Sequence, residues 1–214
     1  MVKEPPPRQR GDEGEGRPIV AFDFDGTLTV EDSYAAFLKW TVGRLGWMAR
    51  LPLLAPPALA YLVHRDRGRL KQTVTRHLLG GQPLEAVRAR AERFAEFHFD
   101  RLLRPDALAR WLEHQRDGAL LVIVTATPDV VVEPFARRLG ADALLGTRLV
   151  VSETGEVTGT FLGENCRAQE KVRRLRERFG EDVQLTAAYG DSSGDTEMLA
   201  LAAEPGMKVF QARP

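Results

Sequence analysis

The sequence predicts an α/β protein: a Rossmann-like parallel sheet with helices on both faces, plus a helical cap inserted after the first strand. Short apolar runs at residues 19–24, 119–127 and 183–190 have the length and composition of buried parallel strands. Segments with helical periodicity alternate with the later runs, as they do where helical crossovers join parallel strands. The long, almost wholly helical region 30–104 breaks this alternation directly after the first strand, so we expect it to cap the strand ends.

Helical periodicity predicts three successive helices in the cap. The first has Asp32 or Ser33 as a candidate N-cap. The second is amphipathic and ends at Gly80-Gly81, because glycine commonly terminates helices. The expected helices span residues 31–46, 67–81 and 83–103, and the expected domains are a disordered leader (1–17), a catalytic core (18–29 and 105–214) and the cap (30–104).

From Pro105 onward, the core is expected to alternate helix and strand. Pro134 lies inside one of these helices and should kink it or delimit its first turn. Residues 144–163 alternate in a β manner around Thr154-Gly155, which predicts a hairpin. In chain order the expected elements are helix 105–118, strand 119–127, helix 128–141, hairpin 144–163, helix 167–180, strand 183–190, helix 193–203 and a final strand 207–210.

Composition excludes several classes of protein. The 214 residues are 43% hydrophobic, which suffices for a substantial core. The 30 basic residues balance 30 acidic ones, so no overall charge attracts nucleic acid or anionic lipid. The single cysteine, Cys166, excludes an internal disulfide and suits a reducing compartment such as the cytoplasm. Residues 1–17 lack the apolar stretch of a signal peptide, and their Pro, Gly and charge content is typical of disorder.

Two carboxylates, Asp23 and Asp25, stand at the end of the first apolar run, in the segment "DFDGT". Like charges repel and desolvation is costly there, so a positive partner is required. With Asp191, which follows another strand, they supply the hard oxygen ligands that Mg²⁺ prefers. The cation would make the clustered carboxylates tolerable and leave room for a phosphate oxygen.

Each remaining motif also has an ordinary structural explanation. Thr125 ends an apolar strand, where threonine is usually a capping or turn residue. Lys171 stands among charged neighbours, as on a solvated helix face, and "GDSSGD" (190–195) could be a loop ending in an N-cap. Taken together, the hydroxyl and the ammonium provide donors for a phosphate, and the whole set suits phosphoryl transfer.

The order and spacing of these motifs resemble those of the haloacid dehalogenase (HAD) superfamily, and the likeness spans residues 18–210. Within it, the chain resembles subfamily IB, which contains phosphoserine phosphatase and bacterial phosphatidylglycerophosphate phosphatases. The resemblance implies an aspartyl-phosphate mechanism. It assigns Asp23 as the nucleophile and Asp25 as the general acid and base. Thr125 and Lys171 would bind the phosphate. Mg²⁺ would be held by Asp23, the backbone carbonyl of Asp25 and Asp191, and Asp195 would support either the metal or Lys171.

Substrate alternatives stay open at this stage. Asp32 occupies the position where phosphoserine phosphatases carry a Glu that helps to bind the substrate amine. Residues 45–63 are apolar, interrupted by Arg50 and three prolines, and form either ordinary cap core or a surface for peripheral contact with a membrane or acyl chain. A phospholipid head group such as phosphatidylglycerophosphate, a small soluble ester such as phosphoserine, and a non-catalytic phospho-acceptor are therefore all considered. Asp25 disfavours the non-catalytic phospho-acceptor. An acid at this position favours rapid turnover of a phosphoenzyme, whereas a regulatory switch benefits from slow hydrolysis.

Overall fold

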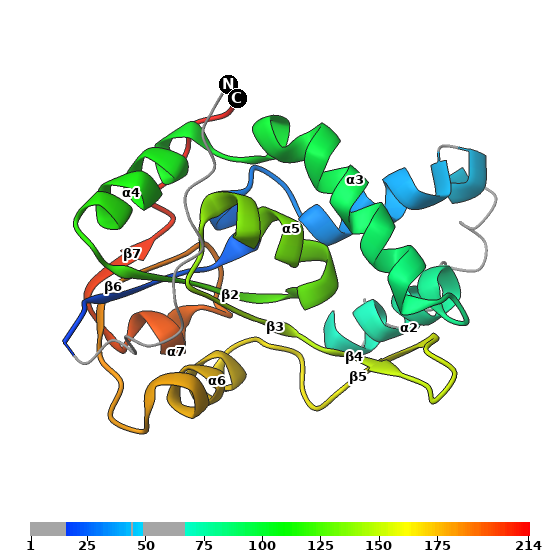
Figure 1. The fold of residues 1–214 in the computed structure, drawn as a ribbon. Helices are drawn as coiled ribbons and strands as arrows, with labels where there is room; N and C mark the ends of the chain where they lie inside the picture. Colours follow the sequence, from blue (N-terminus) through cyan, green and yellow to red (C-terminus); the bar gives the residue numbers. More distant parts are fainter. Residues whose placement is uncertain (1–15, 44, 49–66) are drawn as a thin grey trace.

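The computed structural model describes residues 16–43, 45–48 and 67–214, and it has the predicted α/β architecture (Figure 1). A five-stranded sheet has the order β3-β2-β1-β6-β7, and every neighbouring pair in it is parallel. Its strands are β1 (Ile19–Phe22), β2 (Leu120–Pro128), β3 (Ala143–Thr147), β6 (Leu185–Gly190) and β7 (Ala202–Met207).

The central strand of the sheet, β1, sets the position of the site. In β1, Phe22 pairs with Ile123 of β2 on one side and with Tyr189 of β6 on the other. The residues that follow these three therefore emerge together at the carboxyl edge of the sheet, where ligands bind in open α/β sheets.

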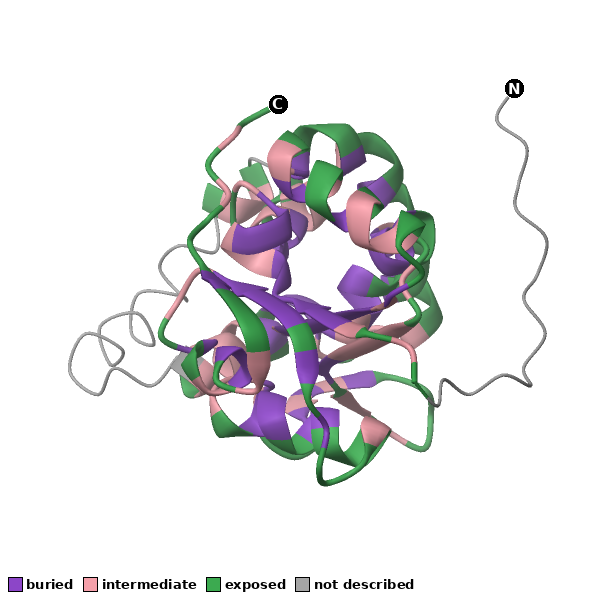
Figure 2. Ribbon diagram, turned by 90° about the vertical axis from the view of Figure 1, so that its left-hand side faces the viewer, coloured by how far each residue is buried: buried purple, intermediate pink, exposed green. Residues whose placement is uncertain are grey.

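Helices cover both faces of the sheet (Figures 1 and 2). One face packs against α4 (Pro105–Arg116) and α5 (Asp129–Leu139), and the other against α6 (Gln169–Phe179) and α7 (Thr196–Leu199). Because strand side chains alternate between faces, Phe22 belongs to the core cluster with Trp111 of α4, whereas Ala21 belongs to the cluster with Leu175 of α6. The buried sheet thus holds the strand ends rigidly.

The cap follows β1 after a short turn, η1 (Phe24–Leu28). It comprises a helix at 33–43 and 45–48, α2 (Arg67–Leu79) and α3 (Leu84–Leu102). Asp32 is the N-cap of the first helix, because its Oδ1 accepts the Ala35 N–H at 2.8 Å. Phe94 and Phe99 of α3 pack on Phe135 of α5, with ring centroids 6.0 and 5.9 Å apart, and so fasten the cap to the core.

The predicted hairpin is shorter than expected. It consists of β4 (Leu149–Val151) and β5 (Val157–Phe161), which are antiparallel. Residues 144–147, assigned to it from their alternation, instead belong to β3, because they extend the parallel sheet beside β2. The hairpin lies on α2: a Cβ at Gly159 would come 2.3 Å from the Arg76 Cα.

The expected helix 193–203 and strand 207–210 are also corrected. The helix is only α7, and the last strand is β7, which begins at Ala202. β7 pairs only with β6 at the sheet edge, and edge strands tolerate proline such as Pro205. The side chains of β7 are mostly exposed, so this strand lacks an apolar run. For that reason the sequence pattern predicted the last strand at residues 207–210 instead.

Three further predictions concern Pro134, the leader and the apolar segment 45–63. Pro134 lies within α5, and the helix continues past it to Leu139. The expected leader lies outside the described residues up to position 15. Arg17, at its end, donates to the Gly118 carbonyl at 2.9 Å. Most of the apolar segment 45–63 also lies outside the described residues. In the ranges that the structure describes, no helix is long and apolar enough to cross a membrane.

Candidate active site

The turn after β1 places Asp23 at the carboxyl edge of the sheet. Its backbone N–H donates to the Tyr189 carbonyl at 2.8 Å, which extends the pairing with β6 by one residue. The chain then turns through Gly26, whose φ of +81° favours glycine. A Cβ at Gly26 would lie 2.2 Å from Asp191 Oδ2, so the absence of a side chain lets two loops of the site approach each other.

Lys171 is the buried cation of the site. Its Nζ donates at 2.6 Å to Asp23 Oδ1, to Asp195 Oδ1 and to the Val124 carbonyl, which uses all of its N–H groups. Burial alone would lower the pKa of the ammonium, but the carboxylates of Asp23 and Asp195 outweigh this effect and raise it above its usual value. Lys171 is therefore charged. It is 1% exposed, so the alternative explanation of Lys171 as part of a solvated helix face does not hold.

Asp195 holds Lys171 in place. Beyond Oδ1, which accepts from Lys171, its Oδ2 accepts from the backbone N–H groups of Asp191 and Ser192 at 3.2 and 2.9 Å and from the Ser192 hydroxyl at 3.0 Å. Burial raises the pKa of Asp195, but Lys171 and the donors of Ser192 together hold it below the ordinary value. Of the two supporting roles considered for Asp195, the hydrogen bonds favour support of Lys171.

The pKa of the Asp23 carboxyl lies well above its ordinary value. Burial raises its pKa to about 7, since desolvation exceeds the opposing effect of Lys171, and the nearby charges of Asp195 and Asp25 act in the same direction as burial. A further positive charge would favour the ionised form. A cation bound beside Asp23 would supply that charge.

Asp25 is held on both of its oxygens. Oδ1 accepts the Ser33 backbone N–H at 2.7 Å, at the start of the first cap helix, and Oδ2 accepts the Thr127 hydroxyl at 2.5 Å. Burial raises the pKa of Asp25, as does the nearby charge of Asp32, whereas Lys71 and the two donors act against them. A carboxyl in this environment can carry a proton and release it, as general acid–base chemistry requires.

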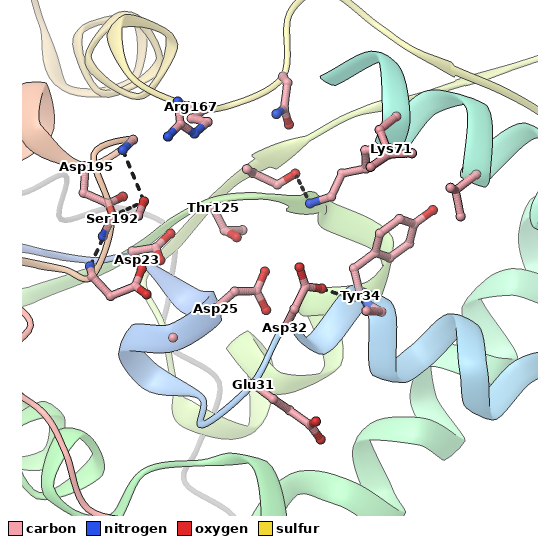
Figure 3. A pocket seen from close by; sticks show the side chains of 18 of the residues that line it. Asp23, Asp25, Glu31, Asp32, Tyr34, Lys71, Thr125, Arg167, Ser192 and Asp195 are labelled. Atoms are coloured by element: carbon pink, nitrogen blue, oxygen red, sulfur yellow. Dashed lines mark hydrogen bonds between the residues drawn. The ribbon is translucent and has the colours of Figure 1, made fainter. Parts of the chain in front are cut away.

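The side chains predicted for the site meet in one cavity of about 590 Å³ between the core and the cap (Figure 3). Thr125 is fully buried on β2, and its Oγ1 accepts the Thr127 N–H at 3.1 Å. The cavity is lined by all six residues that sequence motifs selected: Asp23, Asp25, Thr125, Lys171, Asp191 and Asp195.

Lys71, Arg167 and Thr127 are among the residues of this region that were not selected from the sequence. Lys71 of α2 and Arg167 both line the cavity (Figure 3). Thr127 bonds to Asp25 from the end of β2. Only Thr127 has a sequence signal, since it stands two residues after Thr125; the cap lysine and Arg167 come from segments whose docking cannot be read from local pattern.

The carboxylates can accommodate a metal ion. Oxygens of Asp23, Asp191 and Asp195 lie within 4.8 Å of one another. Because both Asp195 oxygens already accept hydrogen bonds, Asp23 and Asp191 are the better placed ligands. A set of carboxylate oxygens at the edge of a cavity suits Mg²⁺, which keeps several waters and binds few protein groups.

Together, the fold and this site define a hydrolase that acts on phosphate esters. Residues 20–200 match the family of haloacid dehalogenase-like hydrolases. The chain belongs to this family, and it is a phosphatase of the HAD type, as the motifs predict.

Individual proteins resemble the chain in sequence or in fold. The chain is 53% identical over 204 residues to the protein CicA of Caulobacter vibrioides, covering 95% of this chain and 91% of that protein. It shares the fold of a Bordetella pertussis protein of unknown function (TM-score 0.74, 24% identity, 88% of each chain). It also shares the fold of a phosphoserine phosphatase solved as a phospho-aspartyl intermediate analogue (TM-score 0.59, 20% identity, 88% of this chain and 85% of that one). The resemblance to phosphatidylglycerophosphate phosphatases stays a prediction.

Proposed function

We propose that the protein is a Mg²⁺-dependent phosphomonoesterase that transfers the phosphoryl group to Asp23 and then to water. The observation that carries the proposal is the pairing of two carboxyls in one cavity. Asp23 is held by a buried ammonium at 2.6 Å, and Asp25 is held beside it between Ser33 and Thr127. One group is thus arranged to attack phosphorus and the other to move protons.

The proposed reaction has two steps. A carboxylate oxygen of Asp23 attacks phosphorus, the bond from phosphorus to the ester oxygen breaks, and Asp25 gives its proton to that oxygen. Water then attacks phosphorus and gives a proton to Asp25, and the bond from phosphorus to Asp23 breaks. Phosphate leaves, and both carboxyls return to their starting states.

The remaining residues position the phosphate and offset charge. Thr125 would bind a phosphate oxygen. Lys171, whose N–H groups already donate to protein oxygens, would act on the phosphate through its positive charge and would offset the charge on Asp23. Asp23, Asp191 and the backbone carbonyl of Asp25 would hold Mg²⁺, which supplies positive charge for the phosphate when bound.

For the substrate, the apolar wall of the cavity favours an ester with a large or apolar alcohol. Leu38, Leu70 and Val74 of the cap line the cavity together with the carboxylates. Leu45 and Met48, at the start of the segment 45–63, are 84% and 58% exposed, which supports peripheral contact with a membrane. We propose a phospholipid head group such as phosphatidylglycerophosphate, met at the cytoplasmic face.

Phosphoserine is the second candidate. Glu31 and Asp32 also line the cavity and could meet a substrate ammonium, although Asp32 already caps a helix. A relative at 24% identity over 202 residues is the phosphoserine phosphatase of Methanocaldococcus jannaschii.

Phosphate release with Mg²⁺ from phosphatidylglycerophosphate in mixed micelles and from phosphoserine distinguishes the candidates. Strong preference for the lipid is expected, with loss of activity on chelation and in Asp23→Asn. Preference for phosphoserine would overturn the lipid assignment. A long-lived phosphoenzyme without turnover would instead favour the phospho-acceptor.

A further inference from the structure

Thr127 and Lys71 form a hydrogen-bonded chain that ends on Asp25. The Thr127 hydroxyl donates to Asp25 Oδ2 at 2.5 Å. Lys71 Nζ donates to the same hydroxyl at 3.4 Å and to the Ala126 carbonyl at 3.1 Å. Thr127 is fully buried, so these contacts replace water rather than supplement it.

The chemistry of the groups determines the direction of the chain. An ammonium only donates, and a carboxylate only accepts. The hydroxyl between them has one proton, which it gives to Asp25, and its lone pair accepts from Lys71. The order is therefore Lys71 to Thr127 to Asp25, and the cation polarises the hydroxyl toward the carboxyl.

The cap supplies both ends of this arrangement. Lys71 lies on α2, and on the opposite side of Asp25 the Ser33 N–H at the start of the first cap helix donates to Oδ1 at 2.7 Å. Tyr34 and Thr75 join the two cap helices, with their hydroxyls 2.7 Å apart and the Thr75 hydroxyl bonded to the Lys71 carbonyl. The orientation of Asp25 thus depends on the docked cap.

We propose that Thr127 and Lys71 are positioning residues for Asp25 in its role as general acid. The inference rests on the proposed function, in which Asp25 protonates the leaving oxygen. When that proton is transferred and the phosphorus–oxygen bond breaks, the carboxylate that remains is stabilised by the hydroxyl of Thr127 and, through it, by Lys71. The cap would then act in the chemical step as well as in enclosing the substrate.

A series of aryl phosphates tests this inference. The esters share a shape and differ in how much the leaving oxygen needs a proton: phenolate needs one, and dinitrophenolate leaves unaided. The quantity to compare is kcat/KM of the full chain with Mg²⁺, because it includes transfer to Asp23 and excludes the later attack of water.

Thr127→Val is expected to lower kcat/KM for phenyl phosphate on the order of 10-fold and for dinitrophenyl phosphate less than about 2-fold. Thr127→Ser keeps the hydroxyl and should therefore retain kcat/KM for phenyl phosphate. Lys71→Met should lower kcat/KM selectively for phenyl phosphate, as Thr127→Val does. The controls are Thr73→Val, the same change on α2 at a hydroxyl that donates to the Arg69 carbonyl, and Lys39→Met, at an exposed cap lysine. Both should affect all esters alike, and melting curves confirm folding.

Asp25→Asn distinguishes the two levels of the account. Suppose that Asp25→Asn lowers kcat/KM selectively for phenyl phosphate, whereas Thr127→Val lowers kcat/KM equally for every ester. The positioning role of Thr127 is then wrong, and the proposed function stands. If Asp25→Asn itself shows no selectivity, the proposed acid is wrong. A rise in KM for every ester in Lys71→Met, with no selectivity, would assign Lys71 to substrate binding instead and overturn its positioning role.

Discussion

The ammonium of Lys171 lies between carboxylates that could not otherwise share a buried position. Its three hydrogen bonds join β2, the loop after β1 and the loop after β6. Lys171→Met removes the charge and leaves Asp23 and Asp195 buried without a counterion. Breaking a buried pair in this way costs about 3–5 kcal/mol.

Urea denaturation in the presence of a chelator measures this cost without a metal ion. We expect Lys171→Met to lower the free energy of unfolding by at least about 3 kcal/mol. Lys39→Met, at an exposed lysine, serves as the control and should leave the free energy within about 0.5 kcal/mol. Equal stability of the two variants would show that Lys171 is not the counterion.

Gly26 permits the close approach of the loops after β1 and β6. In Gly26→Ala, the new Cβ would overlap Asp191 Oδ2, which must move. We expect the Mg²⁺ concentration needed for half-maximal activity to rise on the order of 10-fold, because Asp191 is a proposed ligand. Gly118→Ala has the same kind of backbone strain, with φ of +79° and nothing within 4 Å of its Cβ, so it should leave the Mg²⁺ requirement unchanged.

At the scale of elements, α6 begins at a strained residue. Ala168 has φ 54° and ψ −127°, a region that favours glycine, and it precedes the helix that presents Lys171. Ala168→Gly should raise the free energy of unfolding by about 1 kcal/mol, because strain of this kind costs of order 1–3 kcal/mol and exceeds the added entropy of glycine.

Ala200→Gly is the control for this substitution, with the opposite sign expected. Ala200 has an ordinary φ of −67° and is exposed, so glycine there should destabilise by about 0.5–1 kcal/mol. Thermal melts of both variants test the pair. Destabilisation by Ala168→Gly would contradict the assigned strain.

The start of α4 holds the C-terminal segment through a charge that depends on pH. Asp106 Oδ2 accepts the backbone N–H groups of Gln211 and Ala212 at 2.7 and 2.9 Å. Burial raises the pKa of Asp106, but the backbone amide donors together outweigh it and hold the pKa below the ordinary value. The attachment is therefore complete above the ordinary carboxyl pKa, and it is lost as the pH falls through the lowered one.

Hydrogen exchange of the Gln211 and Ala212 amides measures this dependence. Protection should decrease in acid in the wild-type protein. In Asp106→Asn, protection should be weak at neutral pH and change little with acidification. Protection that is equal in both proteins at every pH would exclude Asp106 as the attachment.

At the scale of the whole molecule, sequence pattern predicted the sheet and the insertion because each has a local signature. Buried parallel strands such as β2 are nearly continuous apolar runs, and glycine marks the end of α2. The edge strand β7 has no such run, and β3 was merged with the hairpin because alternation does not reveal which partner a strand pairs with. Partners are decided by tertiary contacts.

The candidate site divides in the same way. Asp23, Asp25 and Asp191 stand out because carboxylates interrupt or follow apolar runs, which needs an explanation in any fold. Lys71 lies on an amphipathic cap helix among other basic residues and carries no local signal. Its position beside Thr127 depends on how the cap docks over the sheet, so it emerges only from the three-dimensional structure.

The central claim is that Asp23 carries the phosphoryl group during turnover. Asp25→Asn with dinitrophenyl phosphate tests it most directly, since this ester needs no acid in the first step, whereas the second step loses its base. Rapid acid quenching followed by peptide mass analysis should find the phosphoryl group on the peptide that contains Asp23, and none in the double variant with Asp23→Asn. Phosphate release without any phosphorylated Asp23, or a phosphoryl group on another residue, would contradict the account.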